Sequence, residues 1–173
     1  MKVRFMDLRI TEEEKPQLMA CMERVLEHGY FINGEELSRF EEEFAKFHGR
    51  KYGIGVCSGT GSLYYSLRAL GIGSGDEVIT TSLSWIATAN AIASTGATPV
   101  FADINEDLNI DVESIEPLIT PRTKAILPVH YAGRVCAIER ILEIANKHNL
   151  FVVEDASQAI GAKKNGALAG SFG

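Results

Sequence analysis

Three groups of residues in this sequence could bind a ligand, and each lies next to a segment that is predicted to be a β-strand. Asp155 follows the apolar run of residues 150–153, and Trp85 follows residues 78–81. A third group, residues 58–62, is a short turn of glycine, serine and threonine that opens a predicted helix. In an open parallel sheet, ligands bind outside the carboxyl ends of the strands. The three groups are therefore expected on one rim of a sheet.

The turn of residues 58–62, Ser-Gly-Thr-Gly-Ser, has the chemistry of an anion site. Its small residues let a ligand approach the backbone, and the free N–H groups at the start of a helix favour a negative charge. The hydroxyl groups add donors, so phosphate is the natural guest. The turn is neither a Walker loop nor a G-x-G-x-x-G pattern. The alternative is an ordinary serine or threonine helix cap.

Asp155 and Trp85 would suit a flat ring with a positive charge. The carboxylate of Asp155 faces either a cationic partner or the start of a helix, which it would cap. Trp85, the single tryptophan of the chain, either stacks on a flat heterocycle or anchors the core. A pyridoxal phosphate (PLP) ring combines a phosphate, a flat ring and a cationic nitrogen. An aspartate paired with that nitrogen keeps it protonated, so the ring can take up carbanion electrons.

The elements that must position these residues alternate between strands and helices from residue 52 onward. The predicted strands, short apolar runs, are residues 52–57, 78–81, 98–102, 124–129 and 150–153. The predicted helices are residues 11–28, 35–48, 63–70, 86–94 and 137–148, with a short helix from Asp111 to about Ile119. This alternation predicts an α/β fold of three αβα layers, in which helices cover both faces of a mostly parallel sheet.

Local patterns fix some of the boundaries. Thr11 and Glu14 have the spacing of a capping box at the start of the first helix, although Pro16 makes the first helical residue uncertain. The run Lys164-Asn165-Gly166 predicts a hairpin turn. Cys57 precedes the phosphate turn and is expected to be a small buried residue.

The composition narrows the class of protein. The chain has 173 residues, 46% of them hydrophobic, and a net charge of −6, which argues against binding to a nucleic-acid backbone. No apolar run is long enough to span a membrane, and the N-terminus has no signal-peptide pattern. The three cysteines, Cys21, Cys57 and Cys136, lie far apart and indicate neither a disulfide framework nor a metal site. We therefore expect a cytoplasmic enzyme or binding protein.

The sequence resembles the DegT/StrS-type sugar aminotransferases, a family of PLP enzymes of fold type I. The resemblance covers nearly the whole chain in order. It is carried by residues 58–60, 70–79, 84–90, 96–103, 120–126, 128–133 and 154–158. Together these motifs are highly specific, although singly they are not. The resemblance implies the large PLP-binding domain of such an aminotransferase, with the active site between two subunits of a homodimer.

The resemblance also implies roles for individual residues. Gly59 and Thr60 match the positions that bind the cofactor phosphate, and Trp85 matches the aromatic residue that stacks on the pyridine ring. Asp155 matches the acid that pairs with the ring nitrogen, and Gln158 matches the position beside the ring hydroxyl.

Two further residues are candidates for contacts with a substrate. Phe31 lies in a segment that resembles one near the sugar pocket of the family. His130 lies at the expected rim, where the alternative is a structural histidine with both ring nitrogens bonded.

One part of the family pattern is missing. The Schiff-base lysine of the family lies beyond Gly173, and Lys163 and Lys164 belong to the hairpin. We therefore expect residues 1–50 to be an N-terminal helical segment and residues 51–173 an incomplete PLP-binding domain, without the small C-terminal domain and without turnover by itself.

The expected function of the parent protein is transfer of an amino group from glutamate or glutamine to a keto sugar linked to a nucleotide. The alternatives are a sugar dehydratase that uses pyridoxamine phosphate, a synthase of cyclitols or aromatic amino acids, and a remnant without catalytic activity.

Overall fold

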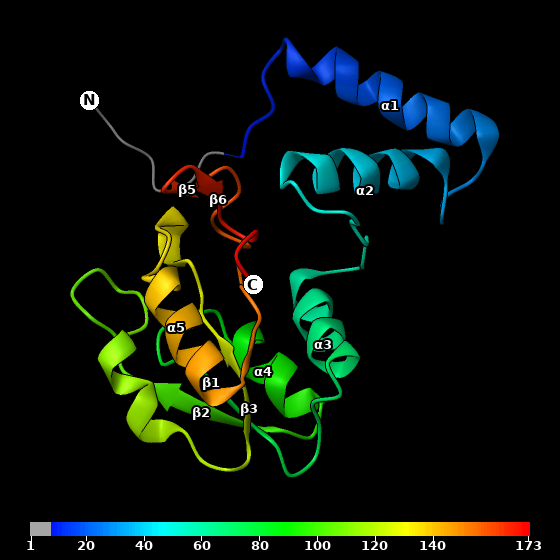
Figure 1. Ribbon diagram of the computed structural model, residues 1–173. Helices are drawn as coiled ribbons and strands as arrows, with labels where there is room; N and C mark the ends of the chain where they lie inside the picture. The colour runs from blue at the N-terminus through cyan, green and yellow to red at the C-terminus, as the bar shows by residue number, and fades with distance from the viewer. Residues whose placement is uncertain (1–7) are drawn as a thin grey trace.

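The computed structural model describes residues 8–173 and contains a parallel sheet between layers of helices (Figure 1). The four strands are β1 (Glu77–Thr81), β2 (Thr98–Ala102), β3 (Thr123–Leu127) and β4 (Phe151–Val152). Their order is β2-β1-β3-β4, and every neighbouring pair is parallel. The αβα fold predicted from the sequence is therefore confirmed.

Successive residues of the central strands pack against different layers. Val78 and Leu127 belong to one core cluster, with α3 (Gly59–Ala69) and α4 (Ala87–Ser94). Ile79 and Ile126 belong to a second cluster, with α5 (Ile138–His148). Because side chains alternate across a strand, a sheet that is buried on both faces needs apolar residues at consecutive positions. The runs that predicted these strands have that pattern.

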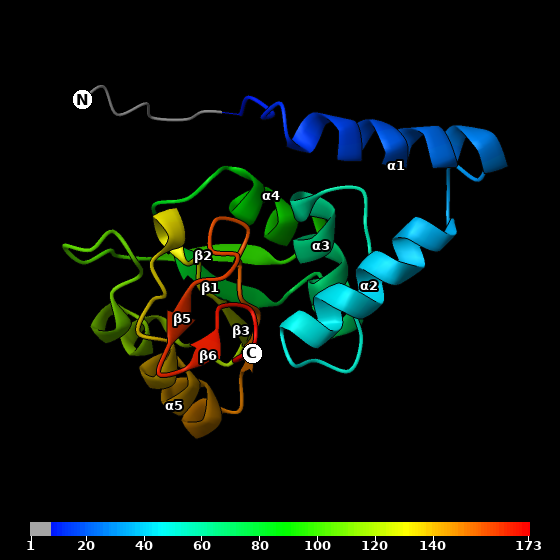
Figure 2. The same cartoon turned by 90° about the horizontal axis from the view of Figure 1, so that it is seen from above.

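Two helices, α1 (Glu14–His28) and α2 (Glu35–Phe47), form an arm beside the αβ body (Figures 1 and 2). The capping box is present: Thr11 Oγ1 accepts the N–H of Glu14 at 3.2 Å, and Glu14 Oε2 accepts the N–H of Thr11 at 2.9 Å. No residue of α1 is buried, and in α2 only Ala45 is. Within residues 8–173, no helix combines the length and the apolar character needed to cross a lipid bilayer.

The predicted strand at residues 52–57 is wrong, because the segment pairs with no described strand and runs along α2 instead. The N–H of Gly55 donates to Glu41 Oε1 at 2.6 Å. A Cβ on Gly53 would lie 2.5 Å from the backbone oxygen of Glu41, so this close approach requires glycine. Cys57, expected to be buried, is exposed because no neighbouring strand covers the segment.

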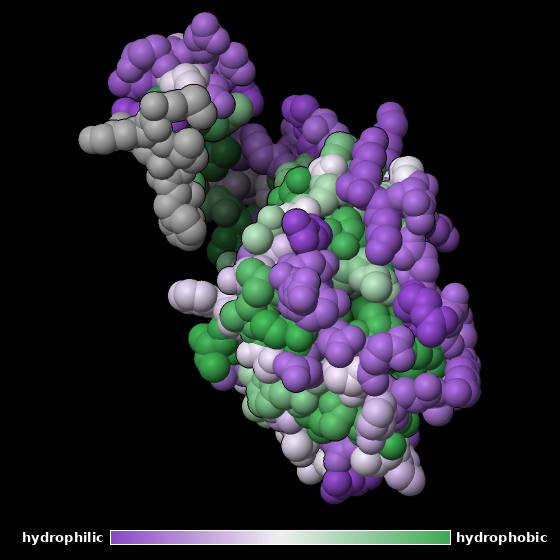
Figure 3. All heavy atoms as spheres, turned by 90° about the vertical axis from the view of Figure 1, so that its left-hand side faces the viewer, coloured by the Kyte–Doolittle hydropathy of each residue, from purple (hydrophilic) through white to green (hydrophobic). Residues whose placement is uncertain are grey.

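Two other predicted elements are shorter than expected. Residues 111–119 form two 3₁₀ turns, η1 (Val112–Ser114) and η2 (Glu116–Leu118), because Pro117 has no N–H to continue an α-helix. Strand β4 has two residues, and Phe151 is 48% exposed since β4 is the edge of the described sheet. On the face of the molecule that Figure 3 shows, hydrophobic patches lie beside polar ones.

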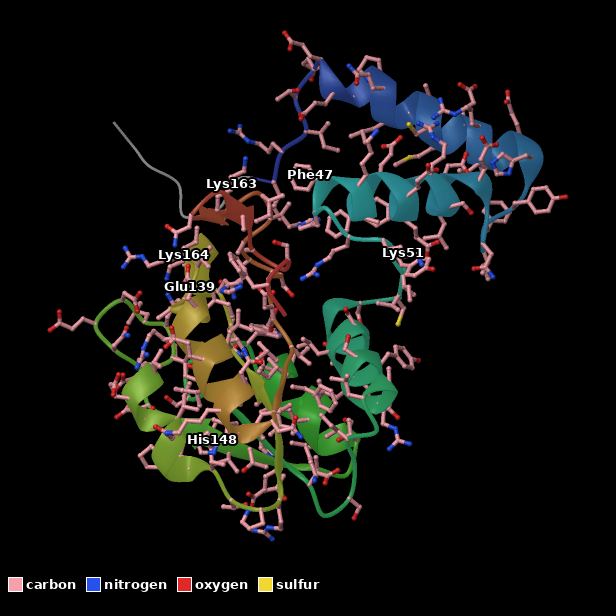
Figure 4. All side chains as sticks on the ribbon, in the orientation of Figure 1. Phe47, Lys51, Glu139, His148, Lys163 and Lys164 are labelled. Carbon is pink, nitrogen blue, oxygen red and sulfur yellow. The ribbon has the colours of Figure 1, made fainter. Side chains whose placement is uncertain are left out.

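The predicted hairpin is confirmed. Strands β5 (Lys163–Lys164) and β6 (Ala167–Leu168) pair antiparallel, and Asn165 and Gly166 both have positive φ, 50° and 85°, as a type I′ turn requires. Lys164 Nζ donates to the backbone oxygen of Cys136 at 2.8 Å and lies 3.3 Å from Glu139 Oε2 (Figure 4). Lys164 thus docks the hairpin against the start of α5.

Candidate functional site

The start of α3 presents backbone donors at the carboxyl-terminal rim. Ser58 caps the helix. Its Oγ accepts a hydrogen bond from the N–H of Gly61 at 3.1 Å, and its backbone oxygen accepts one from the N–H of Ser62 at 2.9 Å. Among the described residues, the N–H groups of Gly59 and Thr60 have no hydrogen-bond partner. The helix cap and the anion site are therefore compatible, because the cap leaves two donors and the positive end of the helix dipole open.

Asp155 is buried, 8% exposed, and its carboxylate is held by uncharged donors. Oδ1 accepts the N–H of Ser157 at 3.2 Å and its hydroxyl at 2.7 Å, and Oδ2 accepts the hydroxyl of Thr88 at 3.1 Å. No ion pair joins Asp155 to a cation within residues 8–173. Burying a carboxylate without a positive partner is costly, so the site favours a cationic group.

Asp155 and the start of α3 line one cavity of about 360 Å³. Ser157, which holds the carboxylate, also approaches the helix start: a Cβ added to Gly59 would lie 3.4 Å from Ser157 Oγ. The negative side chain and the anion-binding turn therefore lie at the same rim, as the strand-end argument predicts.

Trp85 lies just before α4, whose first turn supplies Thr88. The backbone oxygen of Trp85 accepts the N–H of Thr88 at 3.1 Å, and the Thr88 hydroxyl contacts that of Ser84 at 2.8 Å. The indole is 74% exposed, so the alternative that it anchors the core is wrong. Trp85 does not line the cavity of Asp155 and Gly59, although the Thr88–Asp155 bond ties its helix to that cavity.

Gln158 is held by a backbone turn, η3 (Tyr131–Gly133). Its Oε1 accepts the N–H of Ala132 at 2.9 Å, and Ala132 has a positive φ of 50°. The buried Asn109 supports the same turn, because its Oδ1 accepts the N–H of Tyr131 at 3.1 Å. The side chain of Gln158 is thereby fixed at its oxygen end.

His130 does not lie where a substrate could reach it. The ring is fully buried, Nε2 lies 2.8 Å from Glu154 Oε2, and Nδ1 accepts the N–H of Cys136 at 3.3 Å. The suggested substrate role is therefore wrong for this conformation, and the structural alternative describes the residue. Phe31 is 68% exposed and lines a separate hollow with Val56 and Cys57, next to the phosphate turn. Its role in substrate binding stays a prediction.

Sequence reasoning missed the residues that support the site, Thr88, Ser157 and Asn109. Ser84 and Thr88 are four residues apart at the start of a helix, which places two hydroxyls on one face, and that spacing could have indicated a polar contact. Ser157 lies two residues after an aspartate, which is the spacing of an Asx turn.

The family model described as the DegT/DnrJ/EryC1/StrS aminotransferase family matches residues 12–173. One relative is the spore coat polysaccharide biosynthesis protein SpsC of Bacillus subtilis (strain 168), which is 49% identical over 86% of this chain and 38% of its own length. Another is the dTDP-3-amino-3,6-dideoxy-alpha-D-galactopyranose transaminase of Aneurinibacillus thermoaerophilus, 48% identical over 98% of this chain and 47% of its own length.

Among solved structures, S. venezuelae DesV in complex with a ketimine intermediate is similar with a TM-score of 0.90 and 43% identity. The match covers 92% of this chain and 43% of DesV. The chain spans less than half the length of the curated relatives it matches. The family match, the identities and the shared fold agree with one another, and the chain therefore belongs to the DegT/DnrJ/EryC1/StrS aminotransferase family.

Proposed function

We propose that this chain is the N-terminal, cofactor-binding part of a PLP-dependent aminotransferase that transfers an amino group from glutamate or glutamine to a keto sugar carried on a nucleotide. The observation that carries the proposal is the shared cavity of Asp155 and Gly59. Within residues 8–173, this carboxylate has no cationic partner, and the helix N–H groups next to it have no acceptor. The carboxylate favours a positive charge, and the N–H groups favour a negative one. A pyridine ring that carries a phosphate has both, a protonated nitrogen and a phosphate group.

Two residues of the cavity, Gly59 and Asp155, and two residues outside its lining, Thr60 and Trp85, fit PLP by their chemistry. The N–H groups of Gly59 and Thr60 and the hydroxyl of Thr60 would hold the phosphate. The carboxylate of Asp155 would hold a proton on the ring nitrogen, and the exposed indole of Trp85 would cover the ring face. PLP, when bound, would supply an electron sink for the carbon that carries the amino group.

The surrounding contacts prepare Asp155 for that role. Ser157 and Thr88 orient both carboxylate oxygens without neutralising them, because a hydroxyl or an amide N–H carries no net charge. The charge remains available for the protonated ring nitrogen. Gln158, fixed through its oxygen, would present its amide nitrogen to the ring hydroxyl.

The remaining parts of the proposal concern the whole protein. The relatives' lengths support a parent protein that continues beyond Gly173, with the Schiff-base lysine and a small domain in the part that follows. The helical segment expected at residues 1–50 would comprise residues 8–50, since residues 1–7 lie outside the described part of the chain. Residues 51–173 would form part of the large domain. We also propose a cytoplasmic homodimer whose active site lies between the subunits; the exposed apolar side chains of the arm, such as Met22, Phe40 and Phe47, support an interface there.

The experiment compares the full-length wild-type protein with Asp155→Ala and Asp103→Ala. Asp103 is the matched control because it also follows a parallel strand, β2, but is exposed. The wild type should take up PLP with an absorbance that borohydride bleaches, and with glutamate it should aminate a nucleotide-linked keto sugar, followed by mass spectrometry. Asp155→Ala should lose the amination, and Asp103→Ala should retain it.

Three results would contradict the proposal in different ways. A wild-type protein that takes up no PLP would exclude the cofactor and favour a remnant without catalysis. Loss of water from the sugar without transfer of nitrogen would identify the dehydratase alternative. Normal amination by Asp155→Ala would remove Asp155 from the mechanism.

A further inference from the structure

The carboxylate of Glu154, next to Asp155, accepts four hydrogen bonds from protein groups. Oε1 accepts the N–H groups of Phe172 and Gly173, both at 2.6 Å. Oε2 accepts the N–H of Gly170 at 2.9 Å and lies 2.8 Å from His130 Nε2. Only 3% of the Glu154 side chain is exposed, so these four donors replace water around a buried charge.

The two contacts of the His130 ring determine which of its nitrogens carries the proton. The backbone N–H of Cys136 can only donate, so Nδ1 of His130 accepts and the ring proton lies on Nε2. His130 Nε2 therefore donates to Glu154. Burial of the carboxylate opposes its ionisation, but the bonds from His130 and from the three backbone N–H groups outweigh burial and lower the pKa of Glu154.

The segment that Glu154 holds, residues 170–173, lies against the sheet. A Cβ on Gly173 would lie 2.8 Å from the backbone oxygen of Val152 in β4, so the two main chains are in close contact. Arg50 Nη2 donates to the backbone oxygen of Gly173 at 2.9 Å, which fixes the segment from the other side. The segment after β4 is itself held by the segment after β3, because the N–H of Asp155 donates to the oxygen of Pro128 at 2.9 Å.

Glu154 and Asp155 thus make two different contacts from consecutive positions of one strand end. Both residues line the cavity with Gly59, as does Gly170, and Glu154 also binds the backbone of residues 170–173. The bond from Gly170 to Glu154 therefore holds the segment at the wall of the cavity, next to Asp155.

We propose that Glu154 is a positioning residue, which holds the backbone of residues 170–173 in a fixed place relative to Asp155 and so directs the chain that follows Gly173 toward the cofactor site. This inference rests on the proposed function, since it concerns where catalytic groups after Gly173 enter the site. Glu154 acts through the main chain and need not touch the cofactor or a substrate.

The experiment uses the full-length protein with Glu154→Gln and, as a control, Glu106→Gln at an exposed position. Glutamine keeps the shape of glutamate but replaces one acceptor oxygen by a donor, which would face N–H groups. Hydrogen exchange should become at least about tenfold faster at Gly170, Phe172 and Gly173, because lost bonds to a charged group weaken local closure. Exchange at Ile79 and Ile126 of the central strands should stay unchanged.

Kinetics and PLP affinity then separate positioning from general destabilisation. With Glu154→Gln, kcat should fall at least about tenfold while KM for the amino donor and the affinity for PLP stay close to wild type, because glutamine keeps the shape of glutamate in the cavity wall and Asp155 and Gly59 are unchanged. If Glu154→Gln fails to fold, Glu154→Asp, which keeps the charge and shortens the reach, takes its place with the same expected changes.

Unchanged exchange at residues 170–173, or unchanged kcat in a variant with faster exchange there, would overturn the positioning role. A parallel fall of kcat, PLP affinity and exchange protection throughout the sheet would also overturn it, in favour of a purely structural role. Failure of the proposed function has a different appearance: the wild-type protein itself would take up no PLP.

Discussion

Replacing Thr88 by valine should destabilise the protein by removing one support of the buried carboxylate. Valine keeps the branched shape and loses the hydroxyl that donates to Asp155 Oδ2 at 3.1 Å. Oδ2 would then face a methyl group while Oδ1 keeps its two bonds from Ser157. A hydrogen bond to a buried charge contributes about 1.5–3 kcal/mol, so we expect a loss of about 2 kcal/mol, or about 30-fold in the folding equilibrium constant.

The measurement is urea denaturation of the wild type, Thr88→Val and a matched control, Thr98→Val. Thr98 lies in β2, is exposed, and its hydroxyl bonds to none of the described residues, so its replacement should change stability by less than about 0.5 kcal/mol. In a background of Asp155→Ala, the cost of Thr88→Val should shrink by about 1 kcal/mol or more, because the two residues are in direct contact. Equal unfolding midpoints for the two valine variants would refute this account of the carboxylate.

Three further predictions follow from exposure and charge. Trp85→Ala should leave the free energy of unfolding within about 0.5 kcal/mol of wild type, because the indole is 74% exposed, yet it should weaken PLP retention in equilibrium dialysis; unchanged retention would remove Trp85 from the site. Burial raises the pKa of Cys136 to about 12, so iodoacetamide at pH near 8 should label the exposed Cys21 and Cys57 in mass spectra and spare Cys136, and rapid labelling of all three would contradict its burial. The folded-state pKa of Glu154 lies below its unfolded value, so Glu154 stabilises the protein above the usual glutamate pKa of about 4.3, and this stabilisation is lost as the pH falls through the folded-state pKa. The urea midpoint of Glu154→Gln should therefore change less between pH 7 and pH 3 than the midpoint of the wild type. Equal changes in the two proteins would disprove the sign of this effect.

The parts of the fold that depend on local patterns could be predicted from the sequence. Consecutive apolar residues predicted the buried strands β1 and β3, and the C-terminal ends of α3 and α4 lie within one residue of the predicted ends. The start of α3 was predicted at residue 63, but the helix begins at Gly59 because Ser58 caps it. Residues 52–57 could not be predicted in this way, because a strand exists only through hydrogen bonds to a neighbour. The glycines at 53 and 55, which let that segment pack on α2, read equally well as part of a strand.

In the site, too, local patterns indicated the residues themselves but not their distant contact partners. Asp155 and the turn with Gly59 were predictable, because the strand-end rule places charged and glycine-rich segments together. The side chain that supports Asp155, Thr88, is 67 residues away in the sequence, and no local pattern indicates such a contact. The same holds for His130, whose partner Glu154 is 24 residues away in the sequence.

The hydrogen bond from the N–H of Ala132, a residue with positive φ, determines which end of the Gln158 amide group stays free. The amide oxygen is used by a backbone donor, so the group that remains is the –NH₂ end, which can only give protons to a neighbour. Glutamate at this position could keep the same tether to Ala132, but its second oxygen would attract donors and repel a phenolate-like oxygen. A change of one atom, from nitrogen to oxygen, would thus turn the free group from a hydrogen-bond donor into an acceptor without moving the backbone.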